Sequence, residues 1–238
     1  MTRVRLDVWL VRTNETRPDT AALALEELDG RERERAERFV APGDRLRYLA
    51  AHIALRRVLA LHTGTAPGDL RFTRATCPRC GGPHGRPELA VGTPPVHFSL
   101  SHSHGLVLIA VAAAPVGADI QRSPAGGTVE ACLPALHPAE RAEVERRPVN
   151  VRPAEFGRLW TRKEAYLKGI GTGLAHGMST EYLGTDARGR PPGWTVLDLD
   201  LAEDRAYAAA VAVRAEGVRP PEVRERGASF LRAAVPAV

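Results

Sequence analysis

The sequence predicts an α+β protein built from two similar α+β halves that are related by a pseudo-twofold axis. The prediction rests first on a plan that occurs twice along the 238 residues: a strand, then helices, then a pair of strands. It rests also on composition, because 44% hydrophobic and 26% charged residues are ordinary for a globular protein of a length that can bury a sizeable core. We place the boundary between the halves near residue 115 and expect domains at 1–114 and 115–238.

The first half begins with a strand in which alternate residues, from Val4 to Leu10, lie on one side. Its clearest helix has apolar residues at helical spacing and ends at Gly64. A stretch rich in glycine and proline, 75–95, precedes two apolar strands that are joined by a short turn. The expected elements are a strand at 1–12, helices at 19–39 and 44–64, and strands at 96–101 and 106–114.

The second half repeats this plan after Ala114 and Pro115. Its first strand is the short segment "VGADIQ", and an irregular stretch follows near 122–128. The expected elements are a strand at 116–121, helices at 129–147 and 153–169, and strands at 195–201 and 207–215.

Charge and cysteine content restrict the class and the location of the protein. The chain has 33 Lys and Arg against 28 Asp and Glu, a formal net charge of +5 and a pI of about 9.5. This balance favours an acidic partner, which could be nucleic acid, a phosphorylated cofactor or an acidic protein. No apolar run approaches the roughly 18 residues of a membrane span, and the N-terminus lacks the apolar segment of a signal peptide. Three cysteines argue against a disulfide framework, so the expected location is the cytoplasm.

Both lysines of the chain lie in the helix expected at 153–169, although arginine supplies the positive charge everywhere else. At about 100° per residue, Lys163 projects from the middle of an apolar stripe. Glu164 and Lys168, four residues apart, lie together on the flank of that stripe. A lysine that snorkels to solvent and an exposed ion pair are the simple structural alternatives.

The strand at 116–121 carries polar side chains on one face. Asp119 and Gln121 point to one side, whereas Ala118 and Ile120 point to the other. A carboxylate in an otherwise apolar strand needs a partner. With a glutamate from a nearby helix, Asp119 and Gln121 would form an oxygen-rich site suited to Mg²⁺ and completed by phosphates. Such a site among Arg, Lys and His predicts a pyrophosphate-binding pocket.

The segment "CPRCGGPH" has the spacing of a zinc knuckle, with Cys77, Cys80 and His84 as candidate ligands. A closed structural site needs four ligands, and the third cysteine, Cys132, lies in the other half. Reduced thiols in a glycine-rich loop are the alternative. The candidates for a fourth ligand among the histidines are His97, His102 and His104.

The knuckle and the high pI together support an alternative function, a zinc-knuckle nucleic-acid-binding protein. The few aromatic residues before residue 80 form no stacking stripe with the basic residues, which counts against it. It also leaves Asp119, Lys163 and Glu164 without a role. A metallohydrolase built on the histidines lacks carboxylate ligands in a recognisable motif.

In order along the chain, these segments resemble the Sfp-type 4′-phosphopantetheinyl transferases. The hallmark of that family is a Gly-x-Asp-x-Glu strand followed farther along by Trp-x-x-Lys-Glu-x-x-x-Lys. The residues that match in identity and spacing are Gly117, Asp119, Trp160, Lys163, Glu164 and Lys168. The upstream segments that agree are Phe39, the helix at 44–59, Gly85-Arg86-Pro87 and Ser101-His102-Ser103. The resemblance covers about residues 30–215, and the ordered set makes it specific.

The resemblance implies a reaction, the transfer of the phosphopantetheine arm of coenzyme A to a serine of a carrier protein with release of 3′,5′-ADP. It implies catalytic roles for Asp119, Glu164 and Lys168, with Mg²⁺ held by Asp119 and Glu164. Lys163 and Lys168 would be compact charges on phosphate oxygens, where the wide fork of arginine fits less well. Glu164 is the expected acceptor of the serine proton.

The family positions also suggest which residues bind coenzyme A. Besides Lys163 and Lys168, these are Arg47, Arg56, Arg86, Ser101 and His102. Arg33 and Arg35 are further candidates, and each arginine could instead be a solvated surface charge.

One position departs from the family pattern, because Gln121 stands where the family has a second acid. Its carbonyl oxygen could still hold the metal or accept a hydrogen bond from a metal-bound water. The site loses one negative charge, so Mg²⁺ affinity should depend more on the phosphates of the cofactor.

The expected partners are acyl, peptidyl or aryl carrier protein domains and coenzyme A, with no nucleic acid and no membrane. A monomer is expected, because two fused halves would create within one chain the cleft that smaller relatives build between subunits.

Overall fold

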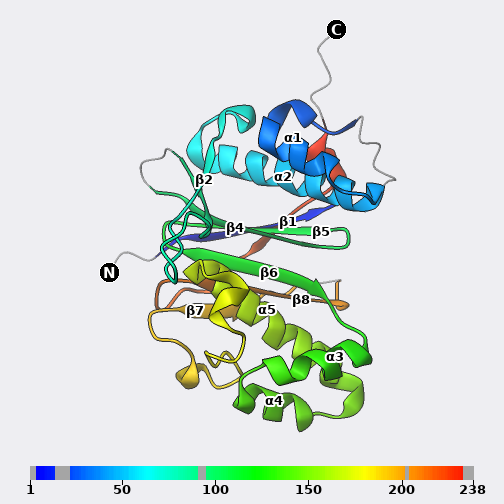
Figure 1. Cartoon of the computed structure of the whole chain (residues 1–238), viewed down its shortest axis with the longest axis vertical. Helices are drawn as coiled ribbons and strands as arrows, with labels where there is room; N and C mark the ends of the chain where they lie inside the picture. Colours follow the sequence, from blue (N-terminus) through cyan, green and yellow to red (C-terminus); the bar gives the residue numbers. More distant parts are fainter. Residues whose placement is uncertain (1–3, 14–21, 91–94, 202–203, 233–238) are drawn as a thin grey trace.

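The computed structural model describes residues 4–13, 22–90, 95–201 and 204–232. It confirms the α+β class, since two stacked sheets lie between layers of helices (Figure 1). The first half contains β1 (Leu6–Arg12), α1 (Gly30–Glu37), α2 (Pro42–Thr63), β2 (Phe72–Arg74), β3 (Pro87–Leu89), β4 (His97–Ser103) and β5 (Leu106–Ala112). The second contains β6 (Val116–Arg122), α3 (Gly126–Cys132), α4 (Pro138–Glu145), α5 (Arg152–Ile170), β7 (Thr195–Asp198), β8 (Tyr207–Val213) and β9 (Val223–Arg226). Short 3-10 turns lie at Leu25–Glu27, Pro67–Asp69, Leu133–Ala135, Val149–Val151, Gly173–His176, Ala187–Gly189 and Ala228–Leu231.

Two larger sheets form the centre of the molecule. The first has the order β4-β5-β1-β9 and the second has the order β6-β8-β7, while β2 and β3 pair in a separate hairpin. Neighbouring strands are antiparallel except β1 and β9, which are parallel. Figure 1 shows the sheets stacked, with α2 above the first sheet and α5 below the second.

The core is divided among these layers because alternate residues of each strand face opposite sides. Trp9, Val11, Val107 and Ile109 face α2, where they pack against a set of leucines, alanines and Ile53. The intervening residues of β1 and β5 pack instead against β6 and β8 across the space between the sheets. The other face of the second sheet packs against α5. The strands β1, β5 and β8 are therefore buried on both faces.

Two of the expected helices are shorter in the structure than the sequence suggested. The segment at 19–39 becomes helical at Gly30, because Asp29 and Glu32 form a capping box that starts the helix there; residues 19–21 lie outside the described residues. The segment at 129–147 is divided into α3 and α4, because Pro134 and Pro138 cannot continue a helix.

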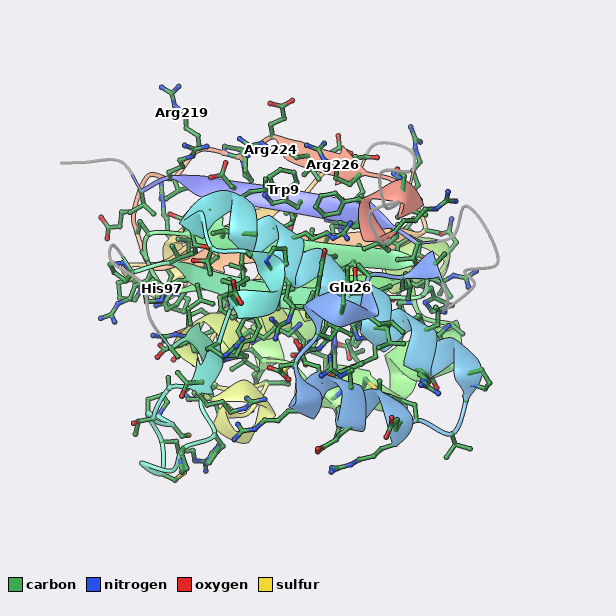
Figure 2. All side chains as sticks on the ribbon, turned by 90° about the horizontal axis from the view of Figure 1, so that it is seen from above. Trp9, Glu26, His97, Arg219, Arg224 and Arg226 are labelled. Carbon is green, nitrogen blue, oxygen red and sulfur yellow. The ribbon has the colours of Figure 1, made fainter. Side chains whose placement is uncertain are left out.

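The strand β9 was not predicted. It brings the chain back from the second half and lies beside β1, with Trp9 opposite Arg224. The guanidinium carbons of Arg224 and Arg226 lie 5.2 and 4.9 Å from the centre of the Trp9 ring. Figure 2 shows these three side chains close together. Arg224 also pairs with Asp7 at 2.9 Å. The strand β9, from the second half of the chain, therefore belongs to the first sheet.

Among the described residues, no helix is both long and apolar enough to cross a membrane.

Candidate active site

The edges of the two sheets meet where β6 lies beside β4, and serine side chains join them. The backbone N–H groups of Ala118 and Arg122 donate to the hydroxyls of Ser99 and Ser103, at 2.9 and 3.1 Å. Ile120 N–H donates to Ser101 at 3.4 Å. Serine at every second position of β4 thus satisfies the free donors of β6. This junction carries the strand that holds Asp119.

The contact between β6 and α5 depends on glycine. A Cβ at Gly117 would lie 1.9 Å from the carbonyl oxygen of Ala165, which leaves no room for any side chain. A Cβ at Gly169 would lie 2.7 Å from the ring of Trp194 and 3.3 Å from the nitrogen of Gly117. This close approach brings Asp119 within reach of the α5 residues Glu164 and Lys168. We call these three residues the carboxylate–lysine cluster.

Asp119 is the centre of the carboxylate–lysine cluster. Its carboxylate is almost completely buried, at 1% exposure. Its Oδ1 accepts hydrogen bonds from Ser101 Oγ and from Lys168 Nζ, both at 2.7 Å. Its Oδ2 is buried and has no partner among the described residues. Buried polar atoms are almost always hydrogen-bonded, so an oxygen left free in this way indicates a ligand position.

Glu164 supplies the second carboxylate. Burial, followed by the negative charge of Asp119, raises the pKa of Glu164, whereas Lys168 opposes the rise. Two neighbouring carboxylates, one of them with a free oxygen, are the kind of oxygen donors that Mg²⁺ prefers. Asp119 and Glu164 therefore fit that ion. Gln121 is half-buried on the same strand, and its amide makes no hydrogen bond within the described residues.

A cavity of about 280 Å³ opens beside the cluster and is lined by Lys168, Arg86, His84 and Thr172 among others. We call it the small cavity. Arg86 pairs with Glu88 at 2.9 Å, but its Nε is buried and has no hydrogen-bond partner in the part of the chain that the structure describes. The same holds for Thr172 Oγ1. The small cavity therefore offers two unused polar groups beside a lysine, as a phosphorylated ligand requires.

A second cavity of about 590 Å³, the large cavity, adjoins the first, because Arg74, Pro87, Phe98 and Leu100 line both. Its other walls come mainly from α1, α2 and β2 and include aromatic and charged side chains. Those walls include Arg31, Tyr48, His52 and Phe72. A ligand longer than either cavity could therefore extend from the carboxylate–lysine cluster toward α2.

Two of the expected coenzyme A residues, His102 and Arg47, lie near the cluster with exposed side chains. His102 is accessible on β4; desolvation by surrounding atoms, followed by the charges of His52, Lys168 and Arg47, lowers its pKa. Arg47 is exposed and pairs with Asp44 on the first turns of α2. Because the charges of Arg47 and Lys168 both act on the pKa of His102, these three side chains lie in one region.

Arg56 is not available to a ligand. Its side chain is 0% exposed and donates to Glu32 at 2.8 Å, to Asp29 at 3.0 Å and to the carbonyl of Pro67 at 2.7 Å. A guanidinium whose donors are used in this way holds α1 against α2. The expected contact of Arg56 with coenzyme A is therefore not supported by its position.

Lys163 also differs from the expectation. It is 2% exposed, its Nζ pairs with Glu140 of α4 at 2.9 Å, and it donates to the carbonyl of Glu181. Burial lowers the pKa of Lys163, and Glu140 opposes that effect. Because the side chain is enclosed on the α4 side of α5, it does not reach the phosphate region that Lys168 lines.

Three other candidates have structural contacts of their own. The hydroxyl of Ser101 is buried and used by Asp119 and the β6 backbone, so it positions Asp119 rather than facing a ligand. Arg33 donates to the carbonyl of Leu28, and Arg35 lies 6.0 Å from the ring centre of Phe39.

Sequence reasoning missed four residues that the structure places at this site: Ser99, Thr172, His52 and Arg74. The serines had a signal, because a hydroxyl at every second position of β4 is a strand-face pattern. The other three come from a strand, a helix and a loop (β2, α2 and the segment after α5), and their approach depends on the tertiary fold.

The fold and the site together define an α+β protein with a carboxylate pair, a lysine and cavities suited to a phosphorylated ligand. Residues 115–211 match the family model of the 4′-phosphopantetheinyl transferase superfamily. The chain is 31% identical over 194 residues to the 4′-phosphopantetheinyl transferase HetI of Nostoc sp., with 78% of each chain covered. It is 32% identical over 178 residues to a putative 4′-phosphopantetheinyl transferase of Synechocystis sp., with 72% of this chain and 67% of the relative covered. It is also 26% identical over 143 residues to the 4′-phosphopantetheinyl transferase Sfp of Bacillus subtilis, covering 60% of each.

The chain therefore belongs to the 4′-phosphopantetheinyl transferase family and is a transferase. This confirms the resemblance drawn from the sequence motifs. The alternative function, a zinc-knuckle nucleic-acid-binding protein, is not favoured by these relatives.

Proposed function

We propose that the chain transfers the 4′-phosphopantetheine arm of coenzyme A to a serine of an apo carrier protein in a Mg²⁺-dependent reaction that releases 3′,5′-ADP. The observation that carries the proposal is the buried, unpartnered Oδ2 of Asp119 beside Glu164, Lys168 and the small cavity. Membership of the family supports the substrate class.

In this proposal the pyrophosphate of coenzyme A lies in the small cavity. Lys168 and Arg86 line that cavity and provide positive charge for the phosphate oxygens. The nucleotide end would extend into the large cavity, near His102 and Arg47. Aromatic walls such as Tyr48 and Phe72 suit a planar base.

The serine oxygen of the carrier protein forms the new bond to the β-phosphorus, and the bond from that phosphorus to the bridging oxygen of the pyrophosphate breaks. The serine proton must leave as the bond forms, and Glu164 is the carboxylate best suited to accept it. In the metal-free chain, burial and the charge of Asp119 raise the pKa of Glu164, so its carboxylate then takes up a proton more readily than an exposed glutamate. Lys168 keeps positive charge next to the oxygens on which negative charge develops.

Asp119 and Glu164 would hold the Mg²⁺, and Gln121 is placed on the same strand to bind it or a water that it carries. Bound Mg²⁺ would supply charge neutralisation at the pyrophosphate. Ser101 and Lys168 orient Asp119 Oδ1, which leaves Oδ2 for the ion.

The acceptor in this proposal is an acyl, peptidyl or aryl carrier protein domain. We also propose that the enzyme acts as a monomer, because one chain supplies both sides of the site. Arg86 and His102 come from residues 1–114, whereas Asp119, Glu164 and Lys168 come from 115–238. The pseudo-twofold relation between these halves stays a prediction.

Mass spectrometry of an apo carrier protein tests the proposal directly. After incubation with the enzyme, coenzyme A and Mg²⁺, the carrier should gain the mass of one phosphopantetheine arm, and 3′,5′-ADP should form in equal amount. A carrier whose acceptor serine is replaced by alanine, and a reaction with EDTA, are the controls. No mass gain on any acyl, peptidyl or aryl carrier, with a folded enzyme, would overturn the proposal.

A further inference from the structure

The segment from Cys77 to His84 forms a loop between β2 and β3, outside the carboxylate–lysine cluster. The two cysteine sulfurs and a ring nitrogen of His84 all lie within 4.8 Å of one another. Cys80 Sγ and His84 Nε2 are 2.8 Å apart. Chain folding alone has therefore gathered three ligand atoms that the proposed transfer reaction does not use.

The backbone of this loop has the form of a metal-binding turn. Gly81 adopts a left-handed φ of 74° and donates its N–H to the carbonyl of Cys77 at 2.9 Å. Cys77 N–H donates in return to the carbonyl of Gly82 at 2.7 Å. These two hydrogen bonds close the turn, so the sulfurs of Cys77 and Cys80 are held near one another.

The types of ligand atom in this loop, two sulfurs and a ring nitrogen, favour zinc. Two thiolates and an imidazole suit Zn²⁺ far better than Mg²⁺, which prefers oxygen. With Zn–S of about 2.3 Å and Zn–N of about 2.0–2.1 Å, tetrahedral ligand atoms stand roughly 3.5–3.8 Å apart. Cys80 Sγ and His84 Nε2 lie closer than this, at 2.8 Å, and all three ligand atoms lie within 4.8 Å of one another. A small rotation of the exposed His84 or Cys80 side chain would open the 2.8 Å contact to the separation that zinc needs.

We propose that Cys77, Cys80 and His84 bind one Zn²⁺, with a water molecule as the fourth ligand. The two thiols lose their protons to solvent as the ion binds, so no oxidant or reductant takes part. A water in the fourth position follows from the surroundings of the loop. Cys80 and His84 are exposed, and within the described parts of the chain no other Cys, His, Asp or Glu joins the group.

The site would hold the segment that carries Arg86. His84 directly precedes Gly85, and a Cβ at Gly85 would lie 2.6 Å from the carbonyl oxygen of Ala75. Ala75 accepts from Gly85 N–H at 2.9 Å and donates to the Arg86 carbonyl at 3.0 Å. His84 and Arg86 both line the small cavity. A zinc ion would therefore close the loop next to the small cavity. That this cavity binds coenzyme A rests on the proposed function.

Metal analysis of the untagged, reduced full chain tests the proposal without an activity measurement. The chain is supplied with Zn²⁺ and freed of unbound metal, and its zinc content is measured by mass spectrometry. We expect one equivalent per chain. Replacement by Co²⁺ should give the visible and near-ultraviolet absorption of a tetrahedral ion with sulfur ligands.

Variants at the exposed ligands avoid the folding risk of changing buried Cys77. Cys80→Ser and His84→Ala should weaken zinc binding by more than the 10–100-fold that loss of an outer-shell partner costs. His84→Cys should retain one equivalent, because a third thiolate replaces the imidazole. Cys132→Ser is the matched control and should bind like the wild type. Circular dichroism checks that each variant is folded.

Three results would overturn the proposal. In the first, the reduced chain takes up no zinc. In the second, Cys80→Ser and His84→Ala bind zinc as the wild type does. In the third, Cys77 and Cys80 form a disulfide, and the chain still takes up no zinc after that disulfide is reduced. Hydrogen exchange of residues 75–86 should slow when zinc binds. The KM for coenzyme A should rise in His84→Ala; a normal KM together with lost zinc would refute only the link to Arg86. Failure of the transfer reaction itself would leave the zinc measurement intact, so the two proposals are tested separately.

Discussion

Lys168 donates a hydrogen bond from its ammonium group to Asp119 Oδ1 over 2.7 Å, and a second to the carbonyl oxygen of Ala118 at 3.1 Å. The pair joins α5 to β6 across 49 residues of sequence. Because Lys168 also lines the small cavity, one ammonium group fixes a carboxylate and faces the ligand space. A lysine has three donors on a compact head, which this double task requires.

Replacement of Lys168 should therefore damage turnover more than folding. Lys168→Met should lower kcat/KM by about 10²–10³-fold, the usual loss when one charge-stabilising donor is removed from an active site. Lys168→Arg should also be impaired although the charge is kept, because the planar guanidinium is wider. Steady-state transfer to a carrier protein measures both, with thermal unfolding as the control. Wild-type kinetics for Lys168→Arg would contradict the argument.

Lys163 should show the opposite behaviour, because it pairs with Glu140 where both side chains are almost fully buried. Lys163→Met leaves a buried carboxylate without its partner, which costs about 3–5 kcal/mol in the free energy of unfolding. The double variant Lys163→Met/Glu140→Gln should recover much of that loss, because Gln removes the unpaired charge and keeps an acceptor for the Leu183 N–H that Glu140 binds. Denaturant unfolding of both variants provides the measurement. Unchanged stability in Lys163→Met, with lost coenzyme A binding, would restore the ligand role that the sequence suggested.

The sequence predicted the elements that carry a strong period and missed those that do not. The helix expected at 153–169 is α5, and the strand at 116–121 is β6, because both patterns are long or bounded by turn residues. The segment that forms β9 reads "VRER", which has too little apolar content to signal a strand. It is ordered by its contacts with Trp9, and no local pattern encodes them.

The site was predicted in the same uneven way. Helical spacing correctly placed Glu164 beside Lys168, and strand alternation isolated Asp119. Helical spacing also placed Lys163 on an apolar face of the helix, and in the structure its side chain is buried there. The partner that makes burial possible, Glu140, lies on another helix. Only the tertiary structure could therefore show whether the Lys163 ammonium pairs with a phosphate of a ligand or with a carboxylate of the chain. Arg56 is a similar case, since its partners are in α1.

Metal dependence should require both carboxylates of the cluster. Asp119→Ala and Glu164→Ala should each remove most turnover, since loss of a metal ligand in phosphoryl transfer costs several kcal/mol of activation free energy. Gln121→Glu adds a carboxylate on the same strand and should lower the Mg²⁺ concentration needed for half-maximal rate. Titration of the rate with Mg²⁺ at saturating coenzyme A measures this. A folded Gln121→Glu variant without activity would refute our account of Gln121.

Gly117 should tolerate no side chain. Its Cβ would meet a backbone carbonyl at 1.9 Å, so Gly117→Ala must separate β6 from α5, at about 1–3 kcal/mol or more. Gly169→Ala meets the Trp194 ring, which can shift, and should cost less. Gly127→Ala is the control, because its Cβ would meet nothing within 4 Å. Equal unfolding free energies for all three variants would contradict this order.

Encounter with the carrier protein should depend on salt. The net charge of +5 favours an acidic protein partner, and charge steering raises association rates only while it is unscreened. The screening length falls to about 8 to 10 Å at physiological ionic strength, so long-range attraction is then largely lost. Transfer at subsaturating carrier should therefore slow as salt rises.

This dependence can be separated from salt effects on coenzyme A, which is itself an anion. With coenzyme A and Mg²⁺ held at saturation, salt acts on kcat/KM for the carrier, because only that constant contains the encounter of the two proteins. The kcat at saturating carrier serves as the internal control and should change little. A kcat/KM that is independent of salt from low to physiological strength would mean that contacts of short range, and not the charge of +5, bring the carrier to the site.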